Sequence, residues 1–213
     1  HMGNGTIFGY DGKYVKVIDK IFNTIVLSLF WLIGCLPIIT IGVSTTAMYY
    51  TAVKVIKNEE GYVLEQFLKS YRRNLKDGIL LEILFAVVLF ILQLNVGILQ
   101  AKTSGNVGLF FICLYYGVSI YAAGMLCYVF PALSRFEMPM GWILKLSMFM
   151  TGRYFLTTVM LLFILVSSAA IVAWIPYTMI VVPGAASLLC SEFMERVLKK
   201  HEPKIEELEE PQL

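Results

Sequence analysis

Long apolar stretches alternate with short charged segments along this 213-residue chain. Several of the stretches are near 20 residues long and carry almost no charge, as a helix that crosses the hydrocarbon core of a bilayer requires. The pattern predicts an all-α polytopic membrane helix bundle that forms a single domain over residues 1–213. About six transmembrane helices are expected, at residues 21–39, 40–56, 78–100, 107–130, 154–174 and 178–193.

The stretch 40–56 is the least typical of the six. It is short, and Gly42, Ser44, Thr45 and Thr46 stand among its apolar residues. Small and hydroxyl-bearing residues are common where a membrane helix packs against protein rather than lipid. A segment that protein covers can also enter the membrane and return to the same side. Crossing and re-entry are therefore both open for this stretch.

The distribution of basic residues favours six crossings, because short loops rich in Lys and Arg stay in the cytoplasm. If 40–56 crosses, sixteen of the 17 Lys and Arg residues fall on one side and Lys102 stands alone on the other. If 40–56 does not cross, the division weakens to thirteen against four. We therefore expect a multi-pass protein of the cell membrane with both termini in the cytoplasm.

Two of the predicted cytoplasmic loops, 61–76 and 138–152, are expected to form amphipathic helices at the membrane surface. In the first, four apolar residues recur at helical spacing: Leu64, Leu68, Tyr71 and Leu75. In one interpretation both helices only connect crossings and contact anionic lipid. In the other they form a docking site for a partner, with Lys69, Arg72, Arg73, Lys76, Trp142 and Lys145 as its candidate residues.

Polar residues inside the predicted spans have two interpretations. Their side chains can join packed helices by hydrogen bonds, which is the more common role, or they can line a path for a solute. The candidate path residues are Thr40, Thr45, Thr46, Tyr49, Tyr50, Gln93 and Asn95. Glu82 lies near the cytoplasmic end of its span, where it can reach water, so coupling to a proton or cation is the less favoured interpretation.

The residue types argue against an enzyme and against a cofactor or metal site. His201 is the only histidine beyond His1, which with Met2 is interpreted as a cloning remnant and the native start, so nucleophile–histidine pairs and zinc sites lack their usual residues. The four cysteines are isolated in or beside apolar stretches, as buried thiols are. Nucleic-acid binding has no support, and residues 199–213 are predicted to be a solvated acidic tail.

Residues 36–50, LPIITIGVSTTAMYY, are followed by EEGY at 59–62 and FLKSYRRN at 67–74. These segments resemble the YesL-like family of Gram-positive bacterial integral membrane proteins, a domain of unknown function. The resemblance is specific over roughly the first 80 residues. Members of that family are often encoded beside carbohydrate ABC importers and polysaccharide-degrading enzymes. The resemblance therefore implies an accessory role in sugar uptake, and it assigns no catalytic residue.

Two functions follow as expectations. The favoured one is a non-catalytic accessory or regulatory membrane protein that contacts lipid and the subunits of a carbohydrate ABC importer or a membrane sensor. The alternative is a stand-alone small-solute transporter or channel with a polar cavity.

The predicted topology can be tested by cysteine labelling of intact cells. We expect a cysteine at Lys102 to react with a membrane-impermeant maleimide and a cysteine at Lys13 to react only after permeabilisation, since the two residues are predicted to lie on opposite sides. Labelling of both positions from outside would show that 40–56 does not cross.

Overall fold

The fold is described from a computed structural model, which places residues 8–103 and 105–201. Every regular element in these two ranges is helical, so the predicted all-α class is confirmed. The α-helices are α1 (Phe8–Gly34), α2 (Ile41–Thr51), α3 (Val63–Arg73), α4 (Leu75–Lys102), α5 (Asn106–Arg135), α6 (Met140–Arg153), α7 (Phe155–Trp174) and α8 (Val182–Leu198). Short elements join them: η1 (Ile38–Thr40), the π-helical turn η2 (Ala52–Lys57), η3 (Pro176–Ile180) and η4 (Lys199–His201).

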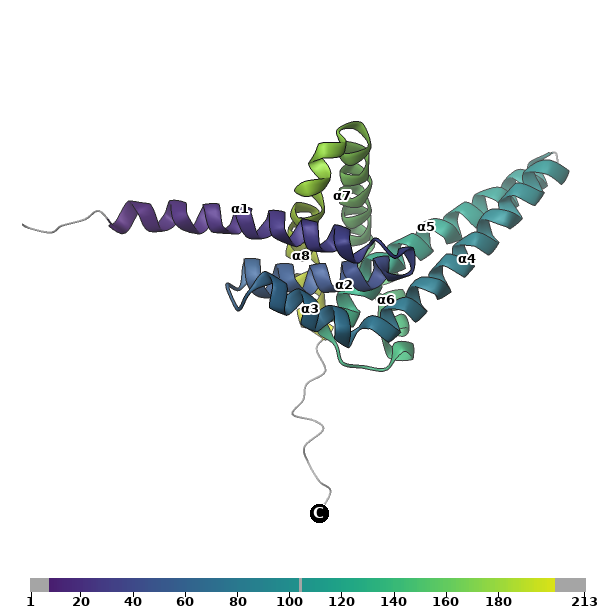
Figure 1. The fold of residues 1–213 in the computed structure, drawn as a ribbon. Coiled ribbons are helices and arrows are strands. Elements are labelled where there is room, and N and C mark those ends of the chain that lie inside the picture. Colours follow the sequence, from purple (N-terminus) through teal and green to yellow (C-terminus); the bar gives the residue numbers. More distant parts are fainter. Residues whose placement is uncertain (1–7, 104, 202–213) are drawn as a thin grey trace, which may run out of the picture.

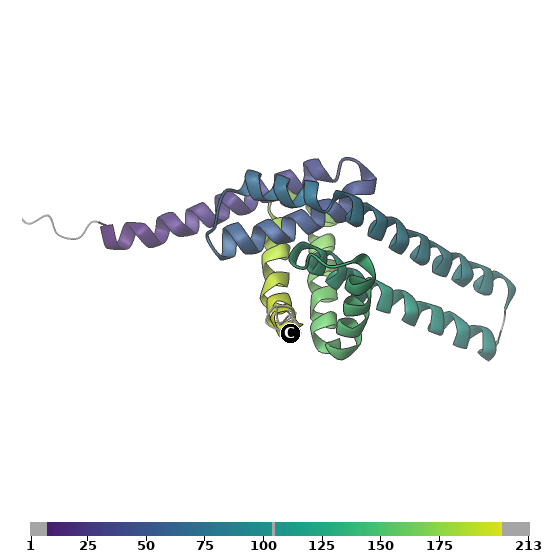
Figure 2. The ribbon, with the colours of Figure 1, turned by 90° about the horizontal axis from the view of Figure 1, so that it is seen from below.

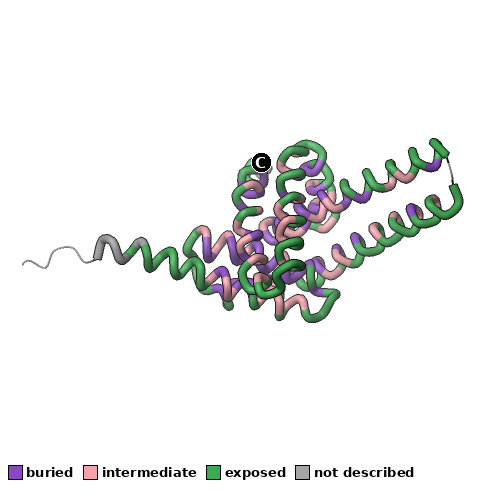
Figure 3. The backbone as a smooth tube through the Cα atoms, turned by 90° about the horizontal axis from the view of Figure 1, so that it is seen from above, coloured by how far each residue is buried: buried purple, intermediate pink, exposed green. Residues whose placement is uncertain are grey.

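The helices form a packed centre from which three arms extend. In Figure 1, α2 and α3 lie at the centre, α1 extends to one side, and α4 with α5 extends as a hairpin to the other. The pair α7 and α8 stands across them, and Figure 2 shows α6 beside this pair. Buried residues gather at the centre, whereas the outer parts of α1 and of the hairpin are largely exposed (Figure 3). The arms therefore present their apolar surface to the surroundings.

Helix α2 is largely buried, because its sequence has no polar face to offer to solvent. Its residues are small or medium-sized, which lets neighbouring backbones approach closely. A Cβ added at Gly42 would lie 2.5 Å from the Phe130 ring, and one added at Gly78 would lie 2.7 Å from Val43. The buried residues are Gly42, Val43, Ser44, Thr46, Ala47, Met48, Tyr49 and Thr51.

The polar groups of α2 are satisfied within the fold. The Thr46 hydroxyl donates to the Gly42 carbonyl oxygen at 2.9 Å, and the Ser44 hydroxyl donates to the Trp31 carbonyl oxygen at 2.9 Å. The Gly42 N–H, one of the unpaired amides at the start of the helix, donates to Oε2 of Glu82 at 2.9 Å. Glu82 is half-buried. Because its carboxylate accepts this amide, it stabilises the N-terminus of α2.

Two hydrophobic clusters lie on either side of α2. One joins α5, α6 and α8 around Tyr128, Ile143 and Met194, and Tyr49 of α2 belongs to it. The other joins α1, α2 and α3 around Leu27, Ala47, Phe67 and other buried residues. Because α2 contributes to both clusters, it connects the N-terminal helices with the C-terminal ones.

Among the residues that the structure describes, four helices are long and apolar enough to cross a membrane: residues 14–34 of α1, together with α4, α5 and α7. The predicted count of six is not confirmed. Helix α2 has 11 residues, about 17 Å at ~1.5 Å per residue, well short of a hydrocarbon core of about 30 Å. Helix α8 has 17 residues and includes Glu192 and Glu195. Both helices lie largely inside the fold.

The end of α5, the start of α1 and the exposed face of α3 differ from what the sequence predicts. Helix α5 continues through Pro131 to Arg135, because the turn after the proline is buried at Ala132 and Leu133 and its packing offsets the lost hydrogen bond. Helix α1 begins at Phe8, before its predicted span. Both amphipathic segments form helices, α3 and α6, but Leu64 and Leu68 of α3 stay exposed, because α3 packs on α2 through Val63, Phe67 and Ser70. Residues 202–213 of the predicted tail lie outside the described ranges.

Helices α1 and α8 meet at Gly184. Its N–H donates to the Ser28 hydroxyl at 2.9 Å, and an added Cβ would lie 2.7 Å from both the Ser28 hydroxyl oxygen and the Thr24 carbonyl oxygen. The backbone carbonyl cannot move without shifting α1. Glycine at this position therefore sets the distance between the two helices.

We expect Gly184→Ala to destabilise the protein by about 1–3 kcal/mol through this overlap. The matched control is Gly97→Ala on exposed α4, where an added Cβ meets nothing within 4 Å and alanine favours the helix. Thermal unfolding in detergent measures both. An equal melting temperature for Gly184→Ala and the unmutated protein would contradict the close α1–α8 packing.

Candidate functional site

The ion pairs of the described residues join four pairs of segments. They link α1 to the turn before α3, η2 to α8, the end of α3 to the α5–α6 loop, and the end of α5 to α8. The pairs are Lys16–Glu59 and Lys20–Glu59, both 3.4 Å, Lys57–Glu192 at 3.1 Å, Arg73–Glu137 at 3.0 Å and the very close Arg135–Glu195. The charged ends of these elements therefore form one polar region.

Glu59 lies in the turn between η2 and α3, with a left-handed backbone at φ 59°. Hydrogen bonds from Lys20 and Lys16 lower the pKa of its carboxyl group below the ordinary value. The carboxylate is fully exposed, so these pairs orient α1 more than they stabilise the fold.

A charged cavity of about 300 Å³ opens at the junction of α2, η2, α3, α5 and α8. Three cationic and two carboxylate side chains lie among its walls, together with two tyrosines. The lining residues, which define the charged cavity below, are Tyr49, Tyr50, Val53, Lys54, Asn58, Glu60, Arg73, Ser134, Arg135 and Glu195. Five elements distant in sequence thus contribute to one polar site.

Glu195 is the buried carboxylate of the charged cavity, with its side chain 9% exposed. One oxygen, Oε1, accepts the hydroxyl of Tyr49 at 2.9 Å, and the other, Oε2, pairs with Arg135. A carboxylate removed from water needs such partners, because the low dielectric makes an unpaired charge costly. The three side chains therefore act as a unit that connects α2, α5 and α8.

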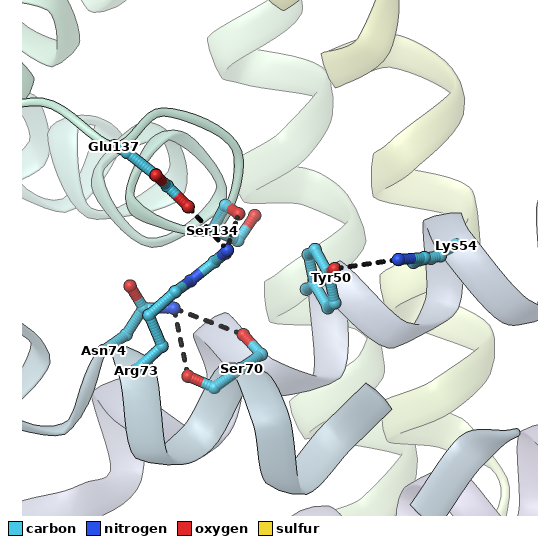
Figure 4. A network of polar contacts seen from close by, with 7 residues as sticks. All are labelled: Tyr50, Lys54, Ser70, Arg73, Asn74, Ser134 and Glu137. Carbon is cyan, nitrogen blue, oxygen red and sulfur yellow. Dashed lines mark hydrogen bonds and ion pairs between the residues drawn. The ribbon is translucent and has the colours of Figure 1, made fainter. Parts of the chain in front are cut away.

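Tyr50 lies between two cations on the other side of the charged cavity (Figure 4). The Lys54 Nζ is 5.5 Å from the centre of the ring and donates to the tyrosine hydroxyl at 3.2 Å. The Arg73 Cζ is 5.3 Å from the same centre, within the range of a cation–π contact. Arg73 also donates to Glu137 and to the Ser134 carbonyl oxygen, both at 3.0 Å. Among the described residues, Lys54 has no carboxylate in ion-pair range.

Two apolar cavities adjoin the charged one along α7 and α8. The inner cavity, about 340 Å³, is lined mainly by α5, α7 and α8 and shares Tyr49 with the charged cavity. The outer cavity, about 370 Å³, lies between α1, α7 and the start of α8 and shares Leu165 and Ala186 with the inner one. The three cavities therefore form a series with common walls.

The candidate solute-path residues are brought together only in part: Thr45 and Tyr49 line the inner apolar cavity. The hydroxyls of Thr40, Thr45 and Thr46 donate to backbone carbonyl oxygens, the arrangement that helix packing requires. Tyr49 and Tyr50 line the charged cavity. Gln93 is exposed and Asn95 bonds its own helix at Ile91, both on the last third of α4, which extends away from α2 (Figure 1).

Four of the six candidate docking residues remain as an exposed group, and the other two, the exposed Arg73 and the half-buried Trp142, contact groups within the fold. Lys69, Arg72, Lys76 and Lys145 are exposed. Arg73 is held by Glu137 and Ser134, and Trp142 packs edge-on against Phe136 at 5.3 Å between ring centres. The exposed group is therefore the part that remains available to a partner.

Sequence reasoning missed Lys54, Arg135 and Glu195 as members of one site. Each stands alone in the sequence, beside apolar residues, and nothing in its local pattern indicates the other two. One signal could have indicated Glu195. Glu192 and Glu195 lie one helical turn apart near the end of an apolar stretch, and a carboxylate in such a stretch usually pairs with a cation inside the fold.

A family model described as "Protein of unknown function, DUF624" matches residues 24–96. The matched region begins in α1 and ends in α4, so it includes the whole of α2 and α3. No curated protein and no solved structure matches the chain. The fold and this similarity define an all-α protein with four apolar helices that are able to span a membrane, similar over this region to an uncharacterised family.

The buried Glu195 cluster can be tested by removing one charge. We expect Glu195→Gln to destabilise the protein by about 3 kcal/mol, because the half-buried Arg135 then loses the carboxylate with which it pairs. The matched control is Glu192→Gln, one turn away, whose exposed pair with Lys57 contributes less than about 1 kcal/mol. Chemical denaturation of both variants gives the comparison, and equal losses would show that the Glu195 cluster is not buried as described.

Proposed function

We propose that the chain is a non-catalytic accessory membrane protein that associates with the subunits of a carbohydrate ABC importer. The supporting observation is the exposure of its apolar helices. In the most hydrophobic window of each candidate span, only 11–17% of the residues are buried. Lipid or another protein covers the remainder.

The arrangement of the spans favours an interaction role over an enclosed path. The α4–α5 hairpin and α1 extend in different directions from the centre (Figure 1), so these helices do not surround a common axis. Spans that pack against a partner can use such faces, since association in lipid depends on surface packing rather than on the hydrophobic effect.

Helix α3 provides a second surface for a partner. Leu64 is 50% exposed and Leu68 39%, and both lie beside the exposed cations Lys69 and Arg72. Exposed leucines next to cations are suited to a surface that is partly apolar and partly acidic. The predicted cytoplasmic position of α3 gives it access to importer subunits on that side.

The resemblance of residues 36–74 to the YesL-like proteins of Gram-positive bacteria supplies the class of partner. Their frequent encoding beside carbohydrate importers supports this choice, and the similarity to an uncharacterised family over residues 24–96 agrees with the resemblance.

A stand-alone sugar transporter is the alternative, and the charged cavity favours it. The cavity has a volume suited to a small ligand and carries two tyrosines, Tyr49 and Tyr50, with several hydrogen-bonding groups. A transporter would need this cavity to open to both sides of the membrane.

The test is copurification of the tagged protein from its native membrane in mild detergent. We expect importer subunits to copurify with the unmutated protein in a fixed ratio. The triple variant Lys69→Glu, Arg72→Glu, Lys76→Glu should recover at least tenfold less of these subunits, because a like-charged contact at an interface costs several kcal/mol. Arg73 is left unchanged because it holds Glu137. Lys102→Glu, at the far end of α4, is the control.

Recovery of importer subunits with the triple variant would remove α3 as the docking surface. Recovery of the chain alone, combined with sugar flux into proteoliposomes that contain only this protein, would replace the accessory role with transport.

A further inference from the structure

We infer that the three adjoining cavities form a binding site for an anionic lipid. Its phosphate headgroup would occupy the charged cavity, and one acyl chain would lie in the two apolar cavities along α8. This inference does not depend on the accessory role.

The first observation is the polarity change across Tyr49. This residue lines the charged cavity with its hydroxyl end bonded to Glu195, and it also lines the inner apolar cavity. A soluble anion would use only the charged cavity, and a plain hydrocarbon only the apolar ones. An amphiphile matches the order of the walls, because its charged and apolar parts are joined.

The second observation is the cation that lacks a carboxylate. Lys54 and Arg73 flank the same Tyr50 ring (Figure 4), and both line the charged cavity. Arg73 pairs with Glu137, and Arg135 pairs with Glu195. Among the described residues, the Nζ of Lys54 donates to the Tyr50 hydroxyl and has no carboxylate in ion-pair range. A phosphate in the charged cavity would accept a charge-assisted hydrogen bond from Lys54.

The carboxylate of Glu60 also lines the charged cavity, and Glu60 is exposed. With Glu195 already engaged by Arg135 and Tyr49, Glu60 is the group that disfavours an anion. The site is therefore expected to prefer a headgroup with one phosphate over a more highly charged one, because each added negative charge increases the repulsion.

The third observation is the length of the apolar track. Glu195 lines the charged cavity, Ala186 and Ser187 line the inner apolar cavity, and Val182 lines the outer one. From Val182 to Glu195, α8 rises about 20 Å at ~1.5 Å per residue. An acyl chain extends over about 15 Å, half of a hydrocarbon core of about 30 Å. The track is thus long enough for one chain.

A buried hydroxyl lies on the apolar part of this track. The Ser187 hydroxyl oxygen is buried and has no hydrogen-bond partner among the described residues. It lines the inner apolar cavity, one helix position from the Ala186 wall shared with the outer one, and lies about 12 Å along α8 from Glu195 at ~1.5 Å per residue. Ser187 would therefore adjoin the acyl chain rather than the headgroup.

Native mass spectrometry of the full chain in detergent tests the site. The probes are dioleoyl phosphatidylglycerol, which carries one negative charge, and dioleoyl phosphatidylcholine, which has no net charge. We expect the anionic lipid to be retained at least tenfold more, with one lipid per chain. Lys54→Gln should lower its retention about tenfold, as the loss of a charge-assisted hydrogen bond does.

The matched control is Lys102→Gln, which removes an equal charge from the exposed end of α4 and should leave retention unchanged. Equal loss in both variants, or equal retention of the two lipids, would overturn the inference, because either result would show only a general attraction of lipid to the protein surface.

The apolar part is tested from the ligand side and from the protein side. Phosphatidylglycerol with six-carbon chains should be retained at least tenfold less than the dioleoyl form, because its shorter chains remove fewer CH₂ groups from water. Ala186→Leu, in the wall shared by both apolar cavities, should lower retention of the dioleoyl form. If glycerol phosphate without any chain displaces the dioleoyl lipid at equal concentration, the site takes a free phosphate ester and the lipid assignment is wrong.

Discussion

The burial of most of α2 is the constraint on which the rest of the structure depends. This helix of 11 residues packs against α1, α3, α4, α5 and α8, so its buried polar groups must find partners within the fold. The threonine and serine hydroxyls bond backbone carbonyls, and Glu82 accepts the amide of Gly42. Small residues are needed for the same reason, because larger side chains would separate the surrounding helices.

Burial of α2 also determines where charge gathers. The helix ends at the π-helical turn η2, which carries Lys54 to the point where α3, α5 and α8 converge. Tyr49 on the last turn of α2 donates a hydrogen bond to Glu195 of α8, and Arg135 of α5 pairs with the same carboxylate. The charged cavity is thus a consequence of the central packing, and its adjacent apolar cavities follow α8 away from it.

The same packing leaves the apolar arms uncovered. Because the centre is filled by α2 and its immediate neighbours, α1 and the α4–α5 hairpin bury little of their surface within the chain (Figure 3). Their outer faces are apolar and can contact lipid or the helices of a partner. This exposure is the basis of the proposed accessory role, because an enclosed channel would need these helices to surround a common path.

The sequence by itself determined the all-α class, the four strongest apolar helices and the two amphipathic helices α3 and α6, because hydrophobic periodicity and length are local properties. It also indicated that 40–56 is unusual, from its small and hydroxylated residues. Tertiary structure alone decided that α2 is central, that Leu64 and Leu68 remain exposed, and that Lys54, Arg135 and Glu195 meet. Those outcomes depend on which helix faces pack together, and contacts between residues more than 50 positions apart leave no periodic signal in a single chain.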